Sequence, residues 1–308
     1  MHHENPGDEG AVPKRRRKRR TTSVDAIKIP ADSDLCYCFP DGGSFAGVIK
    51  LIASFRNDGN FRFNREEVSF ARSNPSKAVL AHAVWKREKV MIKGNVDEIP
   101  ESGFSFGVDL KKLHSIATKT LTKNDLLLMF FRGDNNNMYV EQINHKTTHT
   151  SGNETPFTNQ RVPVLRVPKR IIGVEGRPNV SVCAEEFFIQ INILSIIKCN
   201  QVIIRCNSDG MRMSNEDKDN TVIKSIKFGP ARDDFDDEVT LQVHYKLLKT
   251  ILQMRNICKS DSNVRVFFAN GMPLLLVCSL GPKDDPYGHF QLVIKEEKQE
   301  STATTSME

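Results

Sequence analysis

Apolar residues recur along this chain with two different periods, and the periods alternate. From Phe45 onward, segments with apolar residues three and four positions apart are followed by segments in which every second residue is apolar. The first spacing is typical of amphipathic helices and the second of half-buried strands. The helical spacing predicts four helices, over Phe45–Arg56, Asp109–Leu121, Ala184–Cys199 and Val243–Cys258.

Short alternating segments predict the strands that lie between these helices. We expect six strands before residue 146, at Phe61–Asn64, Val68–Arg72, Ala78–Trp85, Phe104–Val108, Leu126–Phe131 and Met138–Ile143. We expect six more after residue 180, at Val202–Asn207, Met211–Ser214, Val222–Phe228, Val264–Phe268, Leu274–Leu280 and His289–Ile294.

The two halves of the chain repeat one order of elements. The runs LLLMFF at Leu126–Phe131 and NVRVFF at Asn263–Phe268 each follow the second helix of their half and lead through a turn into another strand. Such similarity predicts an α+β fold of two similar domains, each with two helices packed on antiparallel sheets.

Composition divides the chain into five segments. We expect a disordered basic extension over residues 1–44, a first domain over 45–160, an interdomain connector over 161–180, a second domain over 181–297 and a disordered tail over 298–308. The end of the first domain, KTTHTSGNETPFTNQ at 146–160, is polar and is expected to be flexible.

Size and composition exclude several protein classes. The 308 residues are 39% hydrophobic, enough for one large or two ordinary domains. No apolar run reaches the length of a membrane span, and the polar opening Met1–Gly10 does not resemble a secretory signal. The seven scattered cysteines favour a reduced intracellular compartment.

The net charge of +6 is carried mainly by the folded part, because residues 1–44 hold eight Lys and Arg against seven Asp and Glu. Within that extension lies an unbroken basic run, which we interpret as a nuclear localisation signal in preference to a nucleic-acid-binding arm. A merely solubilising run remains an alternative. The run consists of Lys14, Arg15, Arg16, Arg17, Lys18, Arg19 and Arg20.

Candidate catalytic groups are few. No glycine-rich phosphate loop occurs, and Cys36 and Cys38 lack a second pair at metal-binding distance, so we interpret them as small residues in a loosely held segment. His82 and His114 are interpreted as solvated histidines without a nucleophile beside them. We therefore expect a protein that is not an enzyme and that holds no cofactor and no metal. An acidic cluster is interpreted as a solvated loop: Asp233, Asp234, Asp236, Asp237 and Glu238.

All four predicted helices carry a polar face that is mostly neutral or basic, apart from Glu185 and Glu186 at the start of the third helix, where the helix dipole favours acids. If they lie on one side of a continuous sheet, these faces pool positive charge on one surface that suits the phosphate backbone of DNA. Lysines placed only for solubility are the alternative. The residues expected to face DNA are Lys50, Arg56, Lys111, Lys112, Lys119, Lys198, Lys246 and Lys249.

From Phe45 to Glu297 the chain resembles the sliding clamp family of DNA polymerase processivity factors, the proliferating cell nuclear antigen (PCNA) type. The matching segments are FAGVIKLIASFR, EEVSFARSNPSKAVLAHAVW, FGVDLKKLHSIATKTLTKNDLLLMF, SVCAEEFFIQINILSIIKCNQVIIRCNSDGMRMS and GMPLLLVCSL. The extension Met1–Ser44 is not typical of cellular members, which suggests a divergent paralogue or a clamp of a large DNA virus.

The resemblance implies a nuclear, non-catalytic ring of three chains that encircles double-stranded DNA without reading its sequence. Such a ring tethers a DNA polymerase and other replication and repair factors, with a clamp loader as a further partner. The basic positions of the family fall on Ile189 and Asn192 in the third helix. The alternative is a clamp-like nuclear interaction scaffold, or a checkpoint-type subunit, that does not link topologically to DNA.

The resemblance also implies two protein-binding surfaces. A hydrophobic pocket for motif peptides would lie under the connector Val167–Val180, although Ile171 and Ile172 could equally form a buried strand. Its residues would be Ala78, Leu80, Ile171, Ile172, Val174 and Pro273. Subunits would pair edge strands, through Met138, Val140 and Gln142 on one chain and Met211 and Met213 on the next.

Overall fold

The computed structural model describes residues 27–120, 125–133, 136–143, 154–162, 178–197, 201–216, 221–231, 238–269 and 272–295. In the first half the helices are α1 (Gly42–Ala53), α2 (Arg87–Val90) and α3 (Leu110–Thr120), with a short 3₁₀ turn, η2 (Val96–Glu98). The strands are β1 (Leu35–Phe39), β2 (Asp58–Phe63), β3 (Glu67–Ser73), β4 (Val79–Lys86), β5 (Met91–Lys93), β6 (Phe104–Asp109), β7 (Leu126–Phe131), β8 (Asn137–Ile143) and β9 (Thr155–Thr158).

The second half repeats this order with fewer additions. Its helices are α5 (Ala184–Ile196) and α6 (Lys246–Gln253), the latter continued by the 3₁₀ turn η3 (Met254–Asn256). Its strands are β10 (Val180–Cys183), β11 (Gln201–Asn207), β12 (Gly210–Glu216), β13 (Val222–Phe228), β14 (Val239–His244), β15 (Asn263–Phe267), β16 (Leu274–Leu280) and β17 (Gly288–Ile294). All twelve expected strands and all four expected helices are present, with shifted ends, and β7 and β15 occupy equivalent places.

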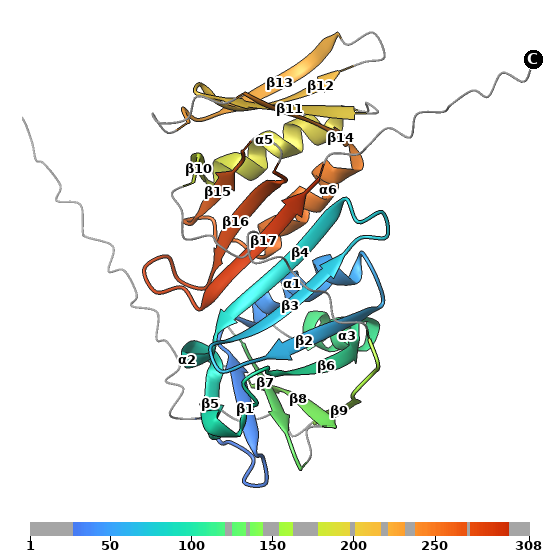
Figure 1. Ribbon diagram of the computed structural model, residues 1–308, viewed down its shortest axis with the longest axis vertical. Helices are drawn as coiled ribbons and strands as arrows, with labels where there is room; N and C mark the ends of the chain where they lie inside the picture. The colour runs from blue at the N-terminus through green and yellow to red at the C-terminus, as the bar shows by residue number, and fades with distance from the viewer. Residues whose placement is uncertain are drawn as a thin grey trace, which may run out of the picture.

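One antiparallel pairing joins the two halves into a single sheet. β17 of the second half pairs with β4 of the first half over seven residue pairs, from Gly288 opposite Trp85 to Ile294 opposite Val79. The resulting eight-stranded sheet has the order β10-β15-β16-β17-β4-β3-β2-β6 and runs through the middle of the molecule (Figure 1). A sheet β5-β1-β7-β8-β9 lies at one end, and a sheet β13-β12-β11-β14 lies at the other.

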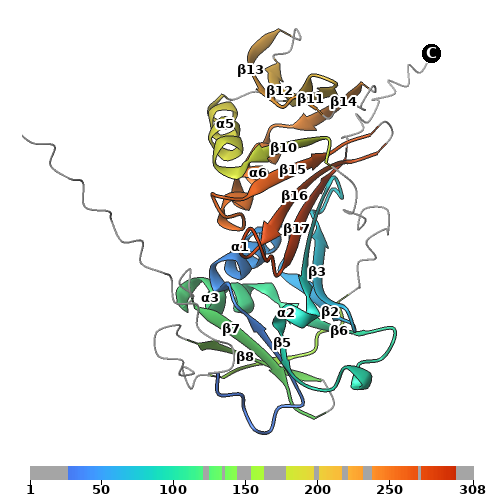
Figure 2. The ribbon, with the colours of Figure 1, turned by 90° about the vertical axis from the view of Figure 1, so that its left-hand side faces the viewer.

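The four predicted helices lie in one layer on one face of the eight-stranded sheet (Figure 2). At the junction, α1 packs directly against η3 because Gly47 has no side chain; a Cβ there would lie 2.7 Å from the carbonyl oxygen of Asn256. The Ser44 hydroxyl donates to the carbonyl of Ile257 (3.0 Å), and the Lys259 ammonium lies 3.3 Å from the Asp41 carboxylate. These contacts hold the helices of the two halves together.

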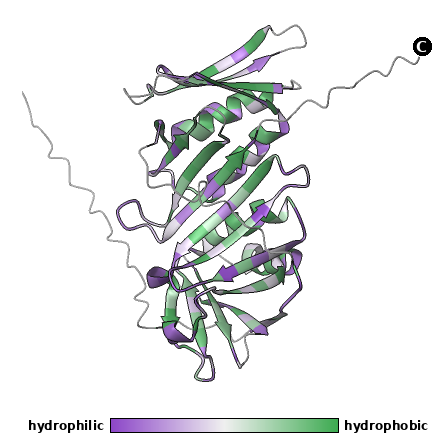
Figure 3. Cartoon of the chain, viewed as in Figure 1, coloured by the Kyte–Doolittle hydropathy of each residue, from purple (hydrophilic) through white to green (hydrophobic). Residues whose placement is uncertain are grey.

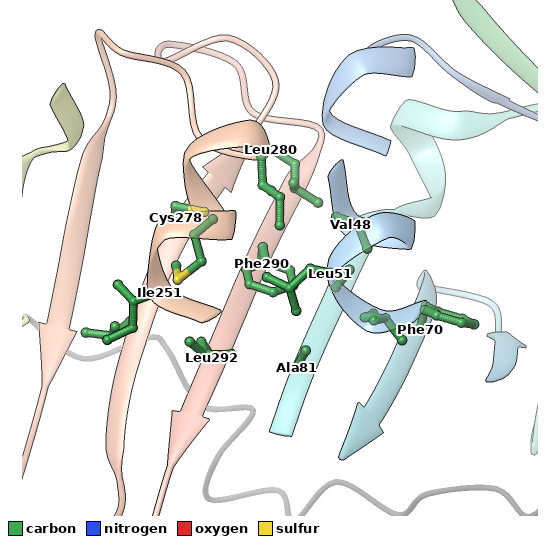
Figure 4. Packing of buried hydrophobic residues seen from close by; sticks show 14 of the residues in the cluster. Val48, Leu51, Phe70, Ala81, Ile251, Cys278, Leu280, Phe290 and Leu292 are labelled. Carbon is green, nitrogen blue, oxygen red and sulfur yellow. The ribbon is translucent and has the colours of Figure 1, made fainter. Parts of the chain in front are cut away.

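A single hydrophobic core runs across the junction. Leu51 of α1 lies beside Phe290 of β17 (Figure 4), and Val48, Leu292 and Ile251 of α6 belong to the same cluster. Figure 3 shows hydrophobic residues along the central strands and hydrophilic residues at many of the loops. Burial of this apolar surface is the main favourable contribution to folding. No helix in the described part of the chain is long and apolar enough to cross a membrane.

The expectation of disorder through Ser44 is wrong for residues 27–44. β1 pairs with both β5 and β7, and all five of its residues are buried. Cys36 and Cys38 therefore do not lie in a loosely held segment. They pack with Ile27 against Leu128 on the sheet face away from the main core, and burial raises the pKa of each thiol to about 12. A continuous apolar strand in polar surroundings gives little periodic signal.

Two further boundaries differ from expectation. The polar segment 146–160 contains β9, which pairs with β8 through four residues. The fourth helix begins at Lys246, not at Val243, because Val243 belongs to β14 and pairs with Val202 of β11. In both places, pairing with a distant strand overrides a weak local preference.

His82 was expected to be solvated, and this is wrong. Its side chain, 3% exposed, lies on β4 opposite Gln291 of β17, and its Nδ1 atom finds no partner in the described part of the structure. His289 lies 2.8 Å from the Gln291 amide through its Nε2 atom. Burial lowers the pKa of both histidines to about 4, so both are neutral at pH 7.

This arrangement predicts that acid weakens the junction. The unfolded chain binds protons on these histidines near pH 6.5 and the folded chain only near pH 4, so their contribution to stability is complete above pH 6.5 and is lost as the pH falls towards 4. For His82 the loss is about 3 kcal/mol. Urea unfolding of His82→Gln should show a flatter dependence on pH than the parent protein. His244→Gln, which changes a half-exposed ring, is the matched control and should keep the parent slope.

Candidate nucleic-acid interface and protein-binding surfaces

The helix layer orients its lysines through simple amphipathic patterns. The apolar residues of α1, α3 and α6 face the sheet, which leaves Lys50, Lys111 and Lys249 exposed on the opposite side. The Asp41 and Asp109 side chains cap α1 and α3: they accept hydrogen bonds from the backbone N–H groups of Ser44 (3.0 Å) and Lys111 (2.8 Å). Such caps stabilise the first turn, where N–H groups lack partners within the helix.

Most of the residues expected to face DNA lie on this layer or at its edge. Lys50, Lys111, Lys246 and Lys249 are exposed on three of the four helices, and Arg56 is exposed just after α1. The Lys119 side chain and Lys198 lie outside the described residues. The structure thus exposes, on helices of one layer, cations that are about 200 residues apart in the sequence, while their contact with DNA stays a prediction.

Helix α5 differs from the other three helices. Its exposed residues include Glu185 and Glu186 in the first turn, then Ile189, Asn192 and Ile196. Ile189 is 48% exposed and Ile196 is 72% exposed. No described residue of α5 is a cation, so the positive surface of the layer is interrupted at this helix.

Lys112 is exposed but already engaged. Its ammonium group donates to the carbonyl oxygen of Pro156 in β9 (2.6 Å) and lies 4.7 Å from the ring centre of Phe157. Arg132 holds the start of the same strand through two hydrogen bonds to the Glu154 carboxylate, at 2.8 and 2.9 Å. Lys112 therefore stabilises β9, a role that sequence patterning did not suggest.

The expected peptide-binding surface is described in part. Leu80 packs against Leu275, Val277 and Val293, a small apolar cluster on the sheet face opposite the helices. Half-buried Pro273 immediately precedes β16. Ala78 instead lines a pocket of ≈ 290 Å³ formed by the β3–β4 turn, the start of α6 and the end of β17. Ile171, Ile172 and Val174 lie outside the described residues.

The expected subunit contacts fall on the wrong strands. β8 lies between β7 and β9, and β12 lies between β11 and β13, so neither strand is at an edge. Met138, Val140, Met211 and Met213 are accordingly buried in the main core, and Gln142 is half-buried. Among the described strands, the edges of these two sheets are β5, β9, β13 and β14. Local pattern could not show this, because a central strand and an edge strand can have the same alternation.

Other candidate groups receive less support. The described residues contain no group of three or more His, Cys, Asp and Glu side chains placed to hold a metal ion. His114 is half-buried on α3. Of the acidic cluster only Glu238 is described, and it is exposed. The basic run Lys14–Arg20 lies outside the described residues.

Solved structures share this architecture. Proliferating cellular nuclear antigen from Entamoeba histolytica superimposes with a TM-score of 0.65 at 12% identity, over 86% of this chain and 100% of that chain. The PCNA2–PCNA3 complex from Sulfolobus tokodaii gives a TM-score of 0.61 at 14% identity, over 84% of this chain and 98% of that chain. No protein-family model and no curated protein matches the sequence.

The molecule is therefore a clamp-type α+β protein built from two similar halves. In particular, its fold is that of PCNA, which confirms the resemblance seen in the sequence segments. At 12–14% identity the likeness concerns the fold, and the activity has to be argued from this chain's own surfaces.

The contact between Lys112 and β9 can be tested by amide hydrogen exchange. In Lys112→Ala the hydrogen bond to Pro156 and the contact with Phe157 are lost, which should favour local opening of β9 by about 1–2 kcal/mol. Exchange at Thr155, Phe157 and Thr158 should rise roughly five- to thirtyfold. Lys111→Ala removes the neighbouring charge without touching β9 and should leave these rates unchanged; equal effects of both variants would contradict the assignment.

Proposed function

We propose that this protein is a DNA sliding clamp, a non-catalytic ring that encircles duplex DNA and tethers a DNA polymerase and other replication or repair factors. The observation that carries the proposal is the single helix layer, continuous across both halves, with exposed lysines on α1, α3 and α6. Long flexible lysines make loose phosphate contacts that position a protein without reading bases, so a closed ring could slide.

The internal repeat of the fold supports ring formation. Within the chain, β4 pairs with β17, the last strand of the other half. β4 is the third strand after α1, so its equivalent in the second half is β13, the third strand after α5. β17 is the last strand of the second half, so its equivalent in the first half is β9. Both β13 and β9 lie at sheet edges in the described part of the chain. Pairing β13 of one protomer with β9 of the next would repeat the internal junction between chains. Repetition of one such junction between chains closes into a ring when its rotation divides a full turn, and we propose that it does here.

Exposed side chains on β13 favour the same contact. Val222 and Ile223 at the start of β13 are each 50% exposed, and burial of such residues in an interface is favourable. An open edge strand also presents unpaired backbone groups, which pairing with a neighbour would satisfy. A homotrimer, as the resemblance to sliding clamps implies, is our proposal for the assembly.

We propose further that the apolar cluster around Leu80 binds motif peptides of partner proteins together with the connector, and that a clamp loader assists assembly on DNA. The basic run Lys14–Arg20 would direct the protein to the nucleus, since short clusters of Lys and Arg are recognised as import signals.

The α5 face favours a second candidate. A DNA-facing helix with Glu185, Glu186 and two exposed isoleucines suits phosphates poorly, which fits a clamp-like interaction scaffold without topological linkage to DNA. Loading on circular DNA separates the two: a sliding clamp is retained on the circle and released when the DNA is cut, whereas a scaffold shows no such difference.

Charge reversal tests the helix layer. The triple change Lys50→Glu, Lys111→Glu and Lys249→Glu should lower the amount of protein that is loaded and retained on circular DNA and reduce the slope of log affinity against log salt by about 2–3, because three phosphate contacts are lost. The fold should survive because all three side chains are exposed. Lys28→Glu, Lys86→Glu and Lys283→Glu change the net charge equally at exposed sites off these helices. The proposed DNA surface would be wrong if this control triple lowered retention as strongly.

Light scattering tests the ring. The mass should approach about three times 34.8 kDa at high concentration. Ile223→Asp should reduce it towards that of one chain, because the change buries a charge beside the proposed β13–β9 pairing. Ile196→Asp alters a still more exposed isoleucine, at the end of α5 and on neither edge strand, and should leave the mass unchanged. A concentration-independent single chain in the parent protein would refute the closed ring.

A further inference from the structure

The backbone of β9 presents only some of its polar groups at the open edge of its sheet. In an antiparallel pair, facing residues alternate between those that exchange hydrogen bonds and those whose N–H and C=O groups point away. Just beyond the strand, the Asn159 N–H donates to the Asn136 carbonyl (3.0 Å), so Phe157, two residues earlier, also points to β8. The backbone groups of Pro156 and Thr158 therefore point to the open edge.

The acceptor at this edge is already occupied within the chain. Pro156 suits an outward position because it has no N–H to donate to β8. Its carbonyl oxygen accepts a hydrogen bond from the Lys112 ammonium of α3 at 2.6 Å. The same ammonium lies 4.7 Å from the ring centre of the buried Phe157. Open strand edges invite pairing with other chains, and Lys112 caps one of the groups that such pairing would use.

The position of this ammonium puts it in competition with a second subunit. A strand that pairs with the open edge of β9 needs the Pro156 carbonyl as an acceptor for one of its own backbone N–H groups. The pairing of β13 with β9 proposed above brings such donors to this edge. Lys112 forms no ion pair within the described residues, so no acidic side chain there holds its charge in place. The ammonium can therefore be displaced without separating a pair of charges.

β9 has other anchors that keep it in the sheet when Lys112 lets go. At the start of the strand, Arg132 donates two hydrogen bonds to the Glu154 carboxylate, at 2.8 and 2.9 Å. Just after its end, the Gly107 N–H of β6 donates to the side-chain oxygen of Asn159 (2.9 Å). Loss of the lysine contact makes brief openings of β9 more frequent, but these anchors keep its backbone in place. A preformed edge loses less conformational entropy when it binds.

We propose that Lys112 is a removable cap on the open edge of β9. In the open chain its ammonium binds the Pro156 carbonyl; when the ring closes, a backbone N–H of β13 from the next chain takes over this carbonyl and the ammonium is released. The inference rests on the proposed ring and adds a step to its closure. The cap weakens association of open chains, because pairing has to break a charge-assisted hydrogen bond. The released ammonium becomes available, beside Lys111, to the surface proposed to face DNA.

Lysine methylation follows the cap directly. Reductive methylation consumes the neutral amine, and a hydrogen bond that stabilises the ammonium form slows the reaction. The parent protein is labelled above and below the concentration at which light scattering shows the ring, without DNA. The methylation rate of Lys112 relative to Lys111, measured by mass spectrometry, should be about three- to tenfold higher in the ring, which corresponds to a loss of roughly half to one pKa unit. Ile223→Asp, which should remain a single chain, should show the low ratio at both concentrations.

A variant without the donor tests the effect on association. Lys112→Met removes the hydrogen bond and keeps an unbranched apolar side chain on Phe157. In the absence of DNA, its ring should dissociate at about tenfold lower concentration than the parent ring, because pairing no longer displaces the ammonium. Lys111→Met removes the neighbouring charge of the same helix and should keep the parent value. Both lysines are exposed, so thermal melting should show unaltered folding.

Two outcomes would overturn the cap: a relative methylation rate of Lys112 that is the same in the ring and in single chains, or a ring of Lys112→Met no tighter than that of Lys111→Met. A parent protein that stays a single chain at every concentration would refute the ring itself, and light scattering alone shows this. A ring that forms while Lys112 remains protected would refute only the cap. Failure of this inference and failure of the proposed function can therefore be told apart.

Discussion

The antiparallel pairing of β4 with β17 is the interaction on which the rest of the structure depends. It turns two half-sheets into one sheet of eight strands and gives the helices of both halves a common face to cover. Gly47 then allows α1 to contact η3, and Ser44 and Asp41 connect the helices across the same line. Without this pairing, nothing in the sheet would place α1 and α6 side by side, and their lysines would not lie on one surface.

The same junction explains where further contacts can form. The two outer sheets end in β9 and β13, whose equivalents β17 and β4 are already paired within the chain. The open edges of β9 and β13 are thus equivalent to the two strand edges that already pair with each other inside the chain, β17 and β4. β9 is short, contains Pro156 and is held by Lys112, and these features also limit unwanted pairing with other chains.

The helix layer is not uniform. Three helices present lysines, while α5 presents acidic and aliphatic side chains. A ring built from this chain would have a lining with alternating basic and non-basic sectors, so contacts with phosphate would be fewer than in a fully basic lining. Weak contacts are compatible with a ring that is retained by closure, since topological linkage does not require high local affinity.

Much of the fold was predictable from the sequence, because helices and strands have fixed periods of 3.6 and 2 residues, which can be recognised from residues close together in the chain. The stripe of α6, the alternation of β15 and the repeated order of elements all follow from neighbouring residues, and so does the class of fold. The candidate site was predictable only in part: the exposure of Lys50, Lys111 and Lys249 follows from their helix faces, but the engagement of Lys112 with Pro156 does not.

The sequence by itself determined which segments are helices and strands, which faces are apolar and that two halves repeat. Only the tertiary structure decided that β8 and β12 are central strands, that His82 is buried and that Ala78, His244 and Lys295 line one pocket. The physical reason is that edge position, burial and pocket shape depend on pairing between residues up to about two hundred positions apart, and local periodicity carries no information about which distant strand will be the neighbour.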